Sequence, residues 1–479
     1  MMIEKKDKIL VMKFGGTSIG SLEAMTRAIQ NVKITGQEWP NLVVVVSALN
    51  GVTDILIDSA RRAAEGDQQF FYQASHELRE RHEKILTQLV PDLARQIQVK
   101  QDINHLISDF SHICQAIAVL GEATPRAMDV VAGLGERLSV HLMAAGMESN
   151  GLSAQFVEGS QLIVTDDHFT AARPDIKATN IRTVDTLKPI LAQRRIPVVT
   201  GFIAATPSGV VTTLGRGGSD YSAALLGVAL GAAEVWIWTD VDGVMTADPR
   251  IVPDAQTIPE LSYNEVAELA YFGAKVLHPK TIHPIIEAGI GLRVLNTFNP
   301  GHPGTRIIAE QIPLENGPIK AVAAFRGLKL VTVQGRGMLG VPGVAARIFT
   351  AVATTGTSVP LIAEAASEQS ICFAVPMEIA PRAIAALQKA LATELALGDI
   401  DRVWATDEVA IVSVLSPGTR QKPGISALIF SVLGEDQINV VAISYGSSEI
   451  SLSLVVDARD FQKALKSLHR LIKTPHHDV

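Results

Sequence analysis

Four short, nearly unbroken runs of apolar residues constrain the fold of this chain more than any other feature. They are Ile9–Phe14, Leu42–Ser47, Ile196–Thr200 and Val235–Thr239. A strand with one face in solvent alternates apolar and polar residues, whereas a strand covered on both faces is apolar throughout. Helical patterns separate these runs, as Leu22–Val32 does between the first two. The alternation predicts an α/β sandwich with a largely parallel sheet.

Composition narrows the class of protein. The chain has 479 residues, which at about 150 residues per domain predicts about three domains. Its net charge of −7 argues against nucleic acid as a partner. Two cysteines are too few for a disulfide framework and fit a reducing compartment. The charged N-terminus lacks an apolar signal core. The longest apolar stretches, such as Ala223–Ala233, are too short to span a bilayer. We therefore expect a soluble cytoplasmic protein with no membrane partner.

The last third of the chain contains an internal repeat. Prolines and glycines gather over 299–327, and we place a domain boundary there. Beyond it, a shift of 81 residues (411 − 330) lays Leu330–Val375 on Ile411–Val456 without a gap. Each copy reads as a strand, a helix, two strands and a second helix. This repeat predicts two copies of one βαββα-type module.

Two glycine-rich loops carry charge next to a predicted strand or helix. Lys13–Ser18 has the sequence KFGGTS at a strand end, and Leu214–Asp220 has the sequence LGRGGSD before an apolar helix. Glycines let backbone N–H groups approach an anion, and the N-terminus of a helix favours negative charge. Arg216 could bind a carboxylate or a phosphate with two hydrogen bonds. Each loop could also be an ordinary turn.

Three further elements follow in the same predicted domain. Thr239–Gly243 reads TDVDG directly after an apolar strand, Asp248–Arg250 reads DPR, and Lys275 lies within GAKVLHP at 273–279. Ligands of parallel sheets bind beyond the carboxyl ends of the strands. Together the loops predict a nucleoside triphosphate site, and no G-x-x-x-x-G-K-[ST] sequence is present, so it is not a P-loop.

In order and spacing these motifs resemble the aspartate kinases, and the repeat resembles their paired ACT domains. The helical stretch after Gly51 is similar to an insertion found in that family. The resemblance implies a three-layer α/β sandwich, the amino-acid kinase fold, followed by two βαββαβ-like ACT modules. It places the catalytic domain at 8–300, a linker at 301–325, and the two ACT-like modules at 326–400 and 401–479.

The resemblance also implies an activity and its residues. ATP, with Mg²⁺, would phosphorylate the β-carboxylate of L-aspartate to 4-phospho-L-aspartate, at the start of aspartate-family amino-acid synthesis. The expected catalytic residues are Lys13 and Asp220. The expected aspartate-binding residues are Ser47, Thr53, Glu136, Arg216, Gly217, Gly218 and Ser219, with Arg216 on the α-carboxylate and Glu136 on the ammonium. The expected ATP-binding residues are Lys13, Phe14, Gly15, Gly16, Thr239, Asp240, Met245, Arg250, Lys275 and Val276, and no residue is expected to bind the metal directly.

Two alternative functions are an oxidoreductase and a catalytically inactive amino-acid sensor. Gly335–Gly340 reads G-x-G-x-x-G after a strand, as in an NAD(P)-dependent oxidoreductase. The matching part of the second repeat copy breaks that pattern, which argues against a dinucleotide site. A catalytically inactive amino-acid sensor is disfavoured by the intact Lys13, Arg216 and Asp220. Phosphorylation of glutamate or acetylglutamate would indicate a sister amino-acid kinase.

ACT-like modules imply regulation by an amino acid and a homodimer or a dimer of dimers. The expected effector-binding residues are Met338, Gly343, Val344, Ser358, Glu364, Ser367 and Glu368. Threonine-sensitive relatives generally carry a glutamine where this chain has Glu364 and Tyr445, so we expect weak or no inhibition by threonine, with lysine or lost feedback as alternatives. Because the sequence ends at Val479, before any homoserine dehydrogenase, we expect a monofunctional enzyme.

Overall fold

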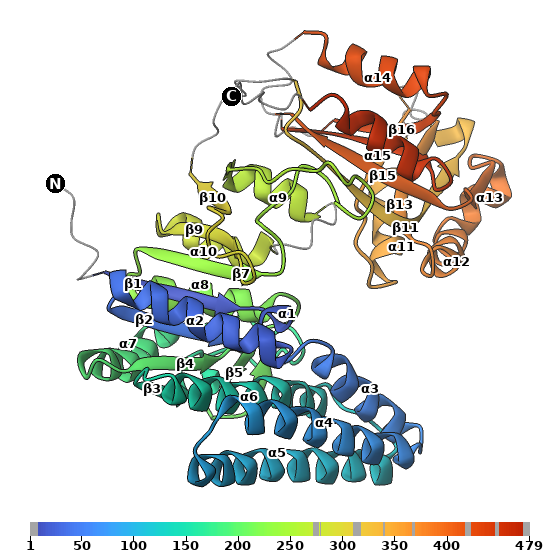
Figure 1. The fold of residues 1–479 in the computed structure, drawn as a ribbon. Coiled ribbons are helices and arrows are strands. Elements are labelled where there is room, and N and C mark those ends of the chain that lie inside the picture. The colour runs from blue at the N-terminus through green and yellow to red at the C-terminus, as the bar shows by residue number, and fades with distance from the viewer. Residues whose placement is uncertain are drawn as a thin grey trace, which may run out of the picture. The chain divides into compact units, whose positions relative to one another are not determined.

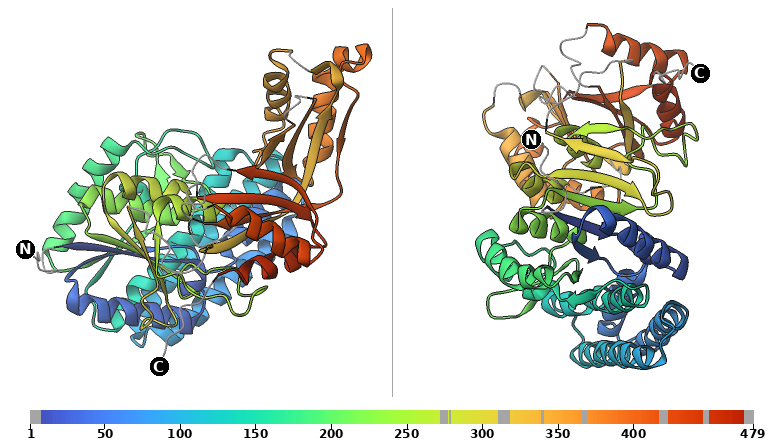
Figure 2. Two further views of the ribbon diagram at one scale, coloured as in Figure 1. Left: turned by 90° about the horizontal axis from the view of Figure 1, so that it is seen from above. Right: turned by 60° about the vertical axis from the view of Figure 1, so that its left-hand side comes forward.

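The computed structural model describes residues 8–271, 277, 279–309, 318–338, 341–365, 369–416, 423–445 and 450–472. The chain forms two compact units (Figures 1 and 2). The first takes its residues from 1–244, 257–263 and 276–310. The second takes its residues from 245–256, 264–275 and 311–479.

The first unit is built on a central sheet. Among the described residues its strand order is β3-β4-β2-β1-β7-β9-β10-β8, and all neighbours are parallel except β9 and β10. The strands are β1 (Ile9–Phe14), β2 (Asn41–Val46), β3 (Ala154–Val157), β4 (Ile196–Thr200), β7 (Glu234–Thr239), β8 (Glu260–Ser262), β9 (Gly291–Asn296) and β10 (Thr305–Ile308). Five of the six residues of β1 and of β2 are buried, as apolar central strands predict.

Helices cover both faces of this sheet. On one face α2 and α6 pack beside β1 and β2, and α3, α4 and α5 lie side by side beyond α6 (Figure 1). On the other face lie α7, α8 and α10. The helices are α2 (Leu22–Glu38), α3 (Val52–Ala64), α4 (Gln68–Leu89), α5 (Leu93–Leu120), α6 (Pro125–Ser149), α7 (Ile176–Ala192), α8 (Gly218–Leu230) and α10 (Pro279–Glu287). The predicted three-layer α/β sandwich is confirmed.

Short elements connect these layers near the site described below. The α1 turn (Gly16–Ile19) follows β1 directly, and the 3-10 turn η2 (Gly159–Gln161) follows β3. The antiparallel hairpin of β5 (Ile203–Ala205) and β6 (Val211–Thr213) leads into α8. Side-chain oxygens of Ser21, Asp67, Asp92 and Thr124 accept backbone N–H groups at the N-termini of α2, α4, α5 and α6.

The second unit contains two modules that match the predicted repeat. The first has helices α11 (Val344–Ala353) and α12 (Ala380–Ala390), and the second has α14 (Ile425–Glu435) and α15 (Phe461–His469). Adding 81 to the starts of α11 and α12 gives the starts of α14 and α15. The other elements are β11 (Ala321–Gln334), η3 (Arg336–Met338), β12 (Ile362–Glu364), β13 (Ser370–Pro376), α13 (Ala392–Leu397), β14 (Arg402–Ala405), β15 (Val409–Leu415), β16 (Val440–Tyr445) and β17 (Ser451–Asp457).

Strand β11 belongs to both modules. Its first half, Ala321–Phe325, pairs with β15 of the second module, and its second half, Leu328–Gln334, pairs with β13 of the first. The register shifts between Phe325 and Leu328, where Gly327 has a φ of +72°. In the described residues one sheet therefore runs through both modules in the order β12-β13-β11-β15-β17-β16, with β14 also paired to β11.

The second unit also takes two segments from the last part of the predicted catalytic domain, 245–256 and 264–275. Ala247 and Val252 pack in one cluster with Val322 and Leu468. Thr246 Oγ1 lies 2.9 Å from Nε2 of the buried His469. Helix α9 (Tyr263–Tyr271) carries the buried Glu265, whose carboxylate accepts two hydrogen bonds from Lys320 Nζ at 2.9 and 3.0 Å.

These units differ from the continuous domains that composition predicts. The predicted linker, 301–325, contains β10, which pairs in the first sheet, and the start of β11, which pairs in the second. Prolines and glycines mark turns reliably, but they do not show that two short strands between those turns pair with strands far away in sequence.

Candidate active site

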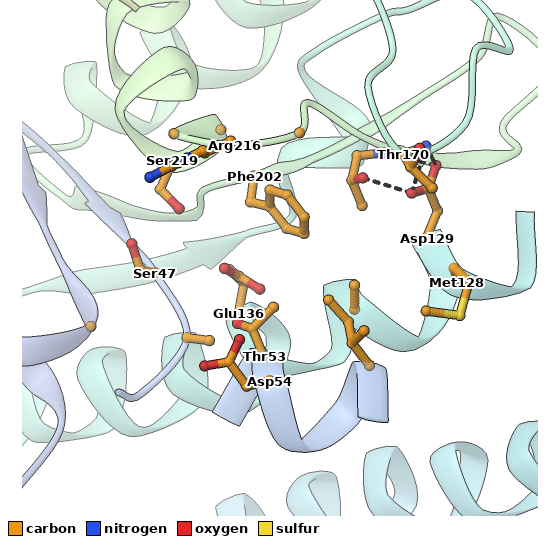
Figure 3. A pocket seen from close by; sticks show the side chains of 18 of the residues that line it. Ser47, Thr53, Asp54, Met128, Asp129, Glu136, Thr170, Phe202, Arg216 and Ser219 are labelled. Carbon is orange, nitrogen blue, oxygen red and sulfur yellow. Dashed lines mark hydrogen bonds between the residues drawn. The ribbon is translucent and has the colours of Figure 1, made fainter. Parts of the chain in front are cut away.

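One large cavity opens in the first unit beyond the carboxyl ends of β1 and β2. Its volume is about 860 Å³. In Figure 3, Ser47, Thr53, Glu136 and Ser219 surround one end of it, and Met128 and Asp129 lie at the other. Ten of the residues expected in the site line it: Lys13, Gly16, Ser47, Thr53, Glu136, Arg216, Gly217, Gly218, Ser219 and Asp220.

Lys13 and Asp220 join the two predicted glycine-rich loops. Lys13 is the fifth residue of β1 and is buried, and Asp220 lies in the first turn of α8. Their side chains form an ion pair. Because the sheet is parallel and α8 starts beside the end of β1, residues 207 positions apart (220 − 13) meet in one place.

The loop after β1 is fixed by buried hydrogen bonds. Gly15 donates its N–H to the Trp238 carbonyl at 3.2 Å, and the buried Ser18 donates its hydroxyl to the same carbonyl at 3.1 Å. Thr297 Oγ1 in turn donates to Ser18 Oγ at 2.7 Å. A Cβ on Gly16 would lie 2.9 Å from the Ala48 carbonyl oxygen. Ser18 therefore supports the loop, and Gly16 lets it approach the turn after β2.

Glu136 is a buried acid in the cavity wall. It lies on α6 with only 3% of its surface exposed. Burial raises the pKa of its carboxyl to about 8, although hydrogen bonding to the Ala48 backbone and the charge of Lys13 oppose this rise. Oε2 has no hydrogen-bond partner among the described residues. A buried acid with one unpaired oxygen is suited to bind a cationic group.

The second glycine-rich loop presents Arg216 at the cavity. Gly215 and Gly217 have φ values of +74° and +73°, a conformation that glycine adopts without strain. Arg216 stands between them and is exposed. The helix α8 begins at Gly218, and Gly218, Ser219 and Asp220 of its first turn line the same cavity. The N-terminus of a helix favours negative charge. The arrangement suits an anion held at Arg216.

The predicted nucleotide residues fall into different parts of the chain. Thr239 ends β7, and its hydroxyl donates to Asp240 Oδ1 at 3.1 Å in the first unit. Met245 and Arg250 belong to the second unit, where the Arg250 guanidinium makes two hydrogen bonds to Asp248 at 2.9 and 2.6 Å. Lys275 and Val276 lie outside the described residues.

Phe14 has a structural role that its place in the motif does not suggest. Its buried ring stacks on Trp238 with centroids 5.8 Å apart and planes 16° apart. Asp242 is likewise held within the protein, because its carboxylate accepts from the side-chain amides of Asn296 at 2.8 Å and Asn299 at 3.0 Å.

The predicted effector residues occupy varied positions in the first module. Met338 is 4% exposed and lies in the hydrophobic core of that module. Gly343 precedes α11 with a φ of +89°, and Val344 is the buried first residue of the helix. Ser358 and Glu364 are exposed, the latter on β12. Ser367 and Glu368 lie outside the described residues.

Sequence reasoning missed several residues of the cavity wall, among them Asp54, Asp129, Thr170 and Phe202. Asp129 could have been found, because it lies seven residues before Glu136 and so shares its helix face. Thr170 and Phe202 have φ values of +70° and +66°. Such backbone strain gathers at functional sites but has no signal in residue type.

No described helix is both long and apolar enough to cross a membrane. No group of three or more histidine, cysteine, aspartate or glutamate side chains in the described part of the chain could hold a metal ion.

Comparisons with known proteins agree with this fold. A model of the amino acid kinase family matches residues 8–296, and an ACT domain model matches residues 331–391 and 412–471. The crystal structure of E. coli aspartokinase III in complex with aspartate and ADP (R-state) has a TM-score of 0.80 and 31% identity, covering 97% of this chain and 99% of that one. Fold, site and family models thus define an amino acid kinase joined to ACT domains.

Two curated relatives narrow the assignment. Aspartokinase 2, chloroplastic, of Arabidopsis thaliana is 31% identical over 477 residues, with 97% of this chain and 84% of that protein covered. Bifunctional aspartokinase/homoserine dehydrogenase 1, chloroplastic, of the same plant is 36% identical over 479 residues, with 98% and 51% covered. The chain therefore belongs to the aspartokinase family, and it spans about half the length of the bifunctional relatives.

Proposed function

We propose that this protein transfers the γ-phosphoryl group of ATP to the β-carboxylate of L-aspartate, yielding 4-phospho-L-aspartate and ADP. The observation that carries the proposal is the meeting of Lys13, Glu136, Arg216 and Asp220 around one cavity. The E. coli relative described above was crystallised with aspartate and ADP, which supports the same pair of substrates here.

The charges of the cavity complement those of aspartate. Arg216 would bind the α-carboxylate with two hydrogen bonds, and Glu136, once ionised, would bind the α-ammonium. Ser47, Thr53 and Ser219 line the same end of the cavity and would donate further hydrogen bonds. These contacts would leave the β-carboxylate turned toward Lys13.

The reaction requires positioning and charge neutralisation rather than a base. The β-carboxylate, with a reference pKa of about 3.9, is already ionised at neutral pH. One of its oxygens would attack the γ-phosphorus while the bond from that phosphorus to the β,γ-bridging oxygen breaks and ADP leaves with the electron pair. Lys13, held by Asp220, would stabilise the negative charge shared by the entering and leaving oxygens.

Mg²⁺ would fit this site as an ion carried by the nucleotide. It prefers phosphate oxygens and water with one or two carboxylates, and Asp220 is a carboxylate at the cavity. When bound, it would neutralise charge on the phosphates of ATP. Gly15, Gly16, Thr239, Asp240, Met245, Arg250, Lys275 and Val276 are the other residues that we propose for nucleotide binding, with Asp248 orienting the Arg250 guanidinium.

A trapping assay tests the reaction. The protein would be incubated with aspartate, ATP, Mg²⁺ and hydroxylamine, which converts an acyl phosphate into a coloured hydroxamate. We expect product with aspartate and none with glutamate or acetylglutamate. Product with either of those acids, and none with aspartate, would contradict the proposal.

One pair of variants tests the role of Arg216. We expect R216A to raise the KM for aspartate about 10- to 100-fold, because a hydrogen-bonded charge pair contributes about 1.5–3 kcal/mol. The control is R306A, which removes an exposed arginine of the same unit that pairs with Glu260 outside the cavity. The R306A variant is expected to keep the KM of the unchanged protein, and an equal effect of both substitutions would refute the assignment.

We further propose that an amino acid regulates this enzyme through its ACT domains. A second structure of the E. coli relative, in complex with lysine and aspartate and described as the T-state, supports an amino-acid effector, with a TM-score of 0.76, 31% identity, and coverage of 97% of this chain and 100% of that one. The trapping assay repeated with lysine and with threonine tests this proposal. Inhibition by lysine is expected, and strong inhibition by sub-millimolar threonine would contradict the expectation drawn from Glu364 and Tyr445.

We propose that the ACT domains also join chains into a homodimer or a dimer of dimers. The apolar side chains of Val441, Ile443 and Tyr445 are 46%, 45% and 46% exposed along β16, which is an edge strand of its sheet in the described residues. An edge strand with exposed apolar side chains favours association with another chain. Light scattering at micromolar concentration would give the mass of the assembly.

A further inference from the structure

Asp129 is a buried carboxylate in the cavity wall without an assigned role. It lies on α6 seven residues before Glu136, with Ala132 between them on the same face. Only 1% of its surface is exposed. Figure 3 places it at the end of the cavity opposite Glu136. It is therefore too far along the helix to share the proposed ammonium site, yet it faces the same space.

Its carboxylate accepts hydrogen bonds from two other segments of the chain. Oδ1 accepts from the Thr213 hydroxyl at 2.6 Å, and Oδ2 accepts from the Thr213 N–H at 3.1 Å. The Thr170 N–H lies 2.9 Å from both oxygens (Figure 3). All of these donors are neutral. Burial raises the pKa of Asp129, and the hydrogen bonds from Thr213 and Thr170 oppose that rise.

These hydrogen bonds fix the base of the Arg216 loop. Thr213 is the last residue of β6 and precedes Arg216 by three residues. The Ala172 N–H donates to the Thr213 carbonyl at 2.9 Å, so the segment around Thr170 pairs with the end of β6. A Cβ on Gly215 would lie 3.1 Å from the Thr170 carbonyl oxygen, which shows how closely the two segments pack.

The conformation of Thr170 shows why an acceptor is needed at this place. Its φ of +70° is unfavourable for a β-branched residue. Such a conformation persists only where the surroundings hold it. Asp129 accepts hydrogen bonds from three donors: the Thr170 N–H, the Thr213 N–H and the Thr213 hydroxyl. A carboxylate can accept all three because both of its oxygens are acceptors.

We propose that Asp129 is a positioning residue that fixes the Arg216 loop against α6 and thereby sets the spacing between Arg216 and Glu136. The inference rests on the proposed function. One carbon separates the carboxylate and ammonium of an α-amino acid, so the two groups that bind them must keep a fixed spacing. Asp129 and Glu136 share one rigid helix, and Asp129 links that helix to the loop.

Kinetics of D129N test the proposal. The substitution replaces one acceptor oxygen by an NH₂ group that would face an N–H donor. We expect the KM for aspartate to rise at least tenfold, while the KM for ATP changes less than twofold. T213V removes only the hydroxyl donor and should raise the KM for aspartate less, about threefold. This second variant keeps the test available if D129N does not fold.

A double-mutant cycle separates positioning from a general loss of structure. If Asp129 acts through Arg216, adding D129N to R216A should change the KM for aspartate less than twofold. The control is T206V, which removes a hydroxyl that accepts the Val210 N–H at 3.1 Å in the same hairpin, away from the cavity. It should lower the melting temperature without raising the KM for aspartate.

The possible outcomes are distinct. A tenfold effect of D129N that persists in the R216A background, or an equal rise in the KM for ATP, would overturn the positioning role. An equal rise in the KM for aspartate in T206V would do the same. If the unchanged protein forms no aspartyl hydroxamate, the proposed function itself is wrong, and this inference falls with it.

Discussion

At the scale of single residues, Glu136 links substrate binding to pH. Burial raises the pKa of its carboxyl to about 8, so at neutral pH the free protein holds this group mostly protonated. Binding of an α-ammonium requires the carboxylate. Aspartate should therefore bind with release of a proton from Glu136, and the energy needed for that release should weaken binding at low pH.

The expected pH dependence follows directly. As pH rises from 6 toward 8, the KM for aspartate should fall about tenfold per pH unit, because the Glu136 carboxyl must ionise before aspartate binds. Above pH 8 that carboxyl is already ionised, so the KM should level off. Steady-state kinetics from pH 6 to 9 would measure it. E136Q cannot ionise, so its KM should be high and flat over this range. A flat profile for the unchanged protein would exclude the proposed role of the Glu136 carboxylate.

At the scale of elements, the position of α6 depends on a close approach at Gly135. A Cβ there would lie 2.7 Å from the Ala48 Cβ and 3.3 Å from Val52 Cγ1. Distances below 3.0 Å force a shift, and the helix carries both Glu136 and Asp129. The turn after β2 and the cavity wall are therefore packed against each other without room for a methyl group.

Two glycine-to-alanine substitutions should have opposite effects. G135A should destabilise the protein by about 1–3 kcal/mol through overpacking, and it should raise the KM for aspartate. G434A, at an exposed position of α14 where a Cβ meets nothing within 4 Å, should stabilise by about 0.5–1 kcal/mol through helix propensity. Denaturant unfolding of both variants would check the signs, and stabilisation by G135A would contradict the packing argument.

At the scale of the whole molecule, the two compact units are not continuous in sequence. The segments 245–256 and 264–275 leave the first unit and fold with the second. A protein cut after residue 310 would lose Val322 and Leu468, which pack with Ala247 and Val252, and Lys320, which pairs with the buried Glu265.

We therefore expect the fragment 1–310 to be unstable when expressed alone. Removing one partner of a buried ion pair costs about 3–5 kcal/mol, and apolar side chains would be exposed as well. Soluble yield and melting temperature would measure the effect, and co-expression of the fragment 311–479 is the control that should restore both. A fragment 1–310 that melts like the full chain would show that the second unit is dispensable.

The sequence predicts some of these features and not others, for physical reasons. Apolar strands and a gapless repeat are local or periodic signals, so the sandwich and the two modules could be predicted. Lys13 and Asp220 could be placed at one site because parallel strands end, and the helices after them begin, at one edge of the sheet. The role of Asp129 depends on donors at Thr170 and Thr213, which no local pattern contains. The segment 245–256 folds with the second unit because it packs against residues more than 60 positions away, such as Ile319, which follows Val252 by 67 residues (319 − 252).

Strand β11 limits how the two modules can be exchanged with those of a homologue. Since its first half completes the second module and its second half begins the first, the second module is not a contiguous segment of the chain. Exchange of one copy with a homologue would need crossover points on both sides of Gly327 to keep each half of the strand with its own neighbours. Recombination in this region should therefore succeed for the pair of modules together and fail for the second module transferred without Ala321–Phe325.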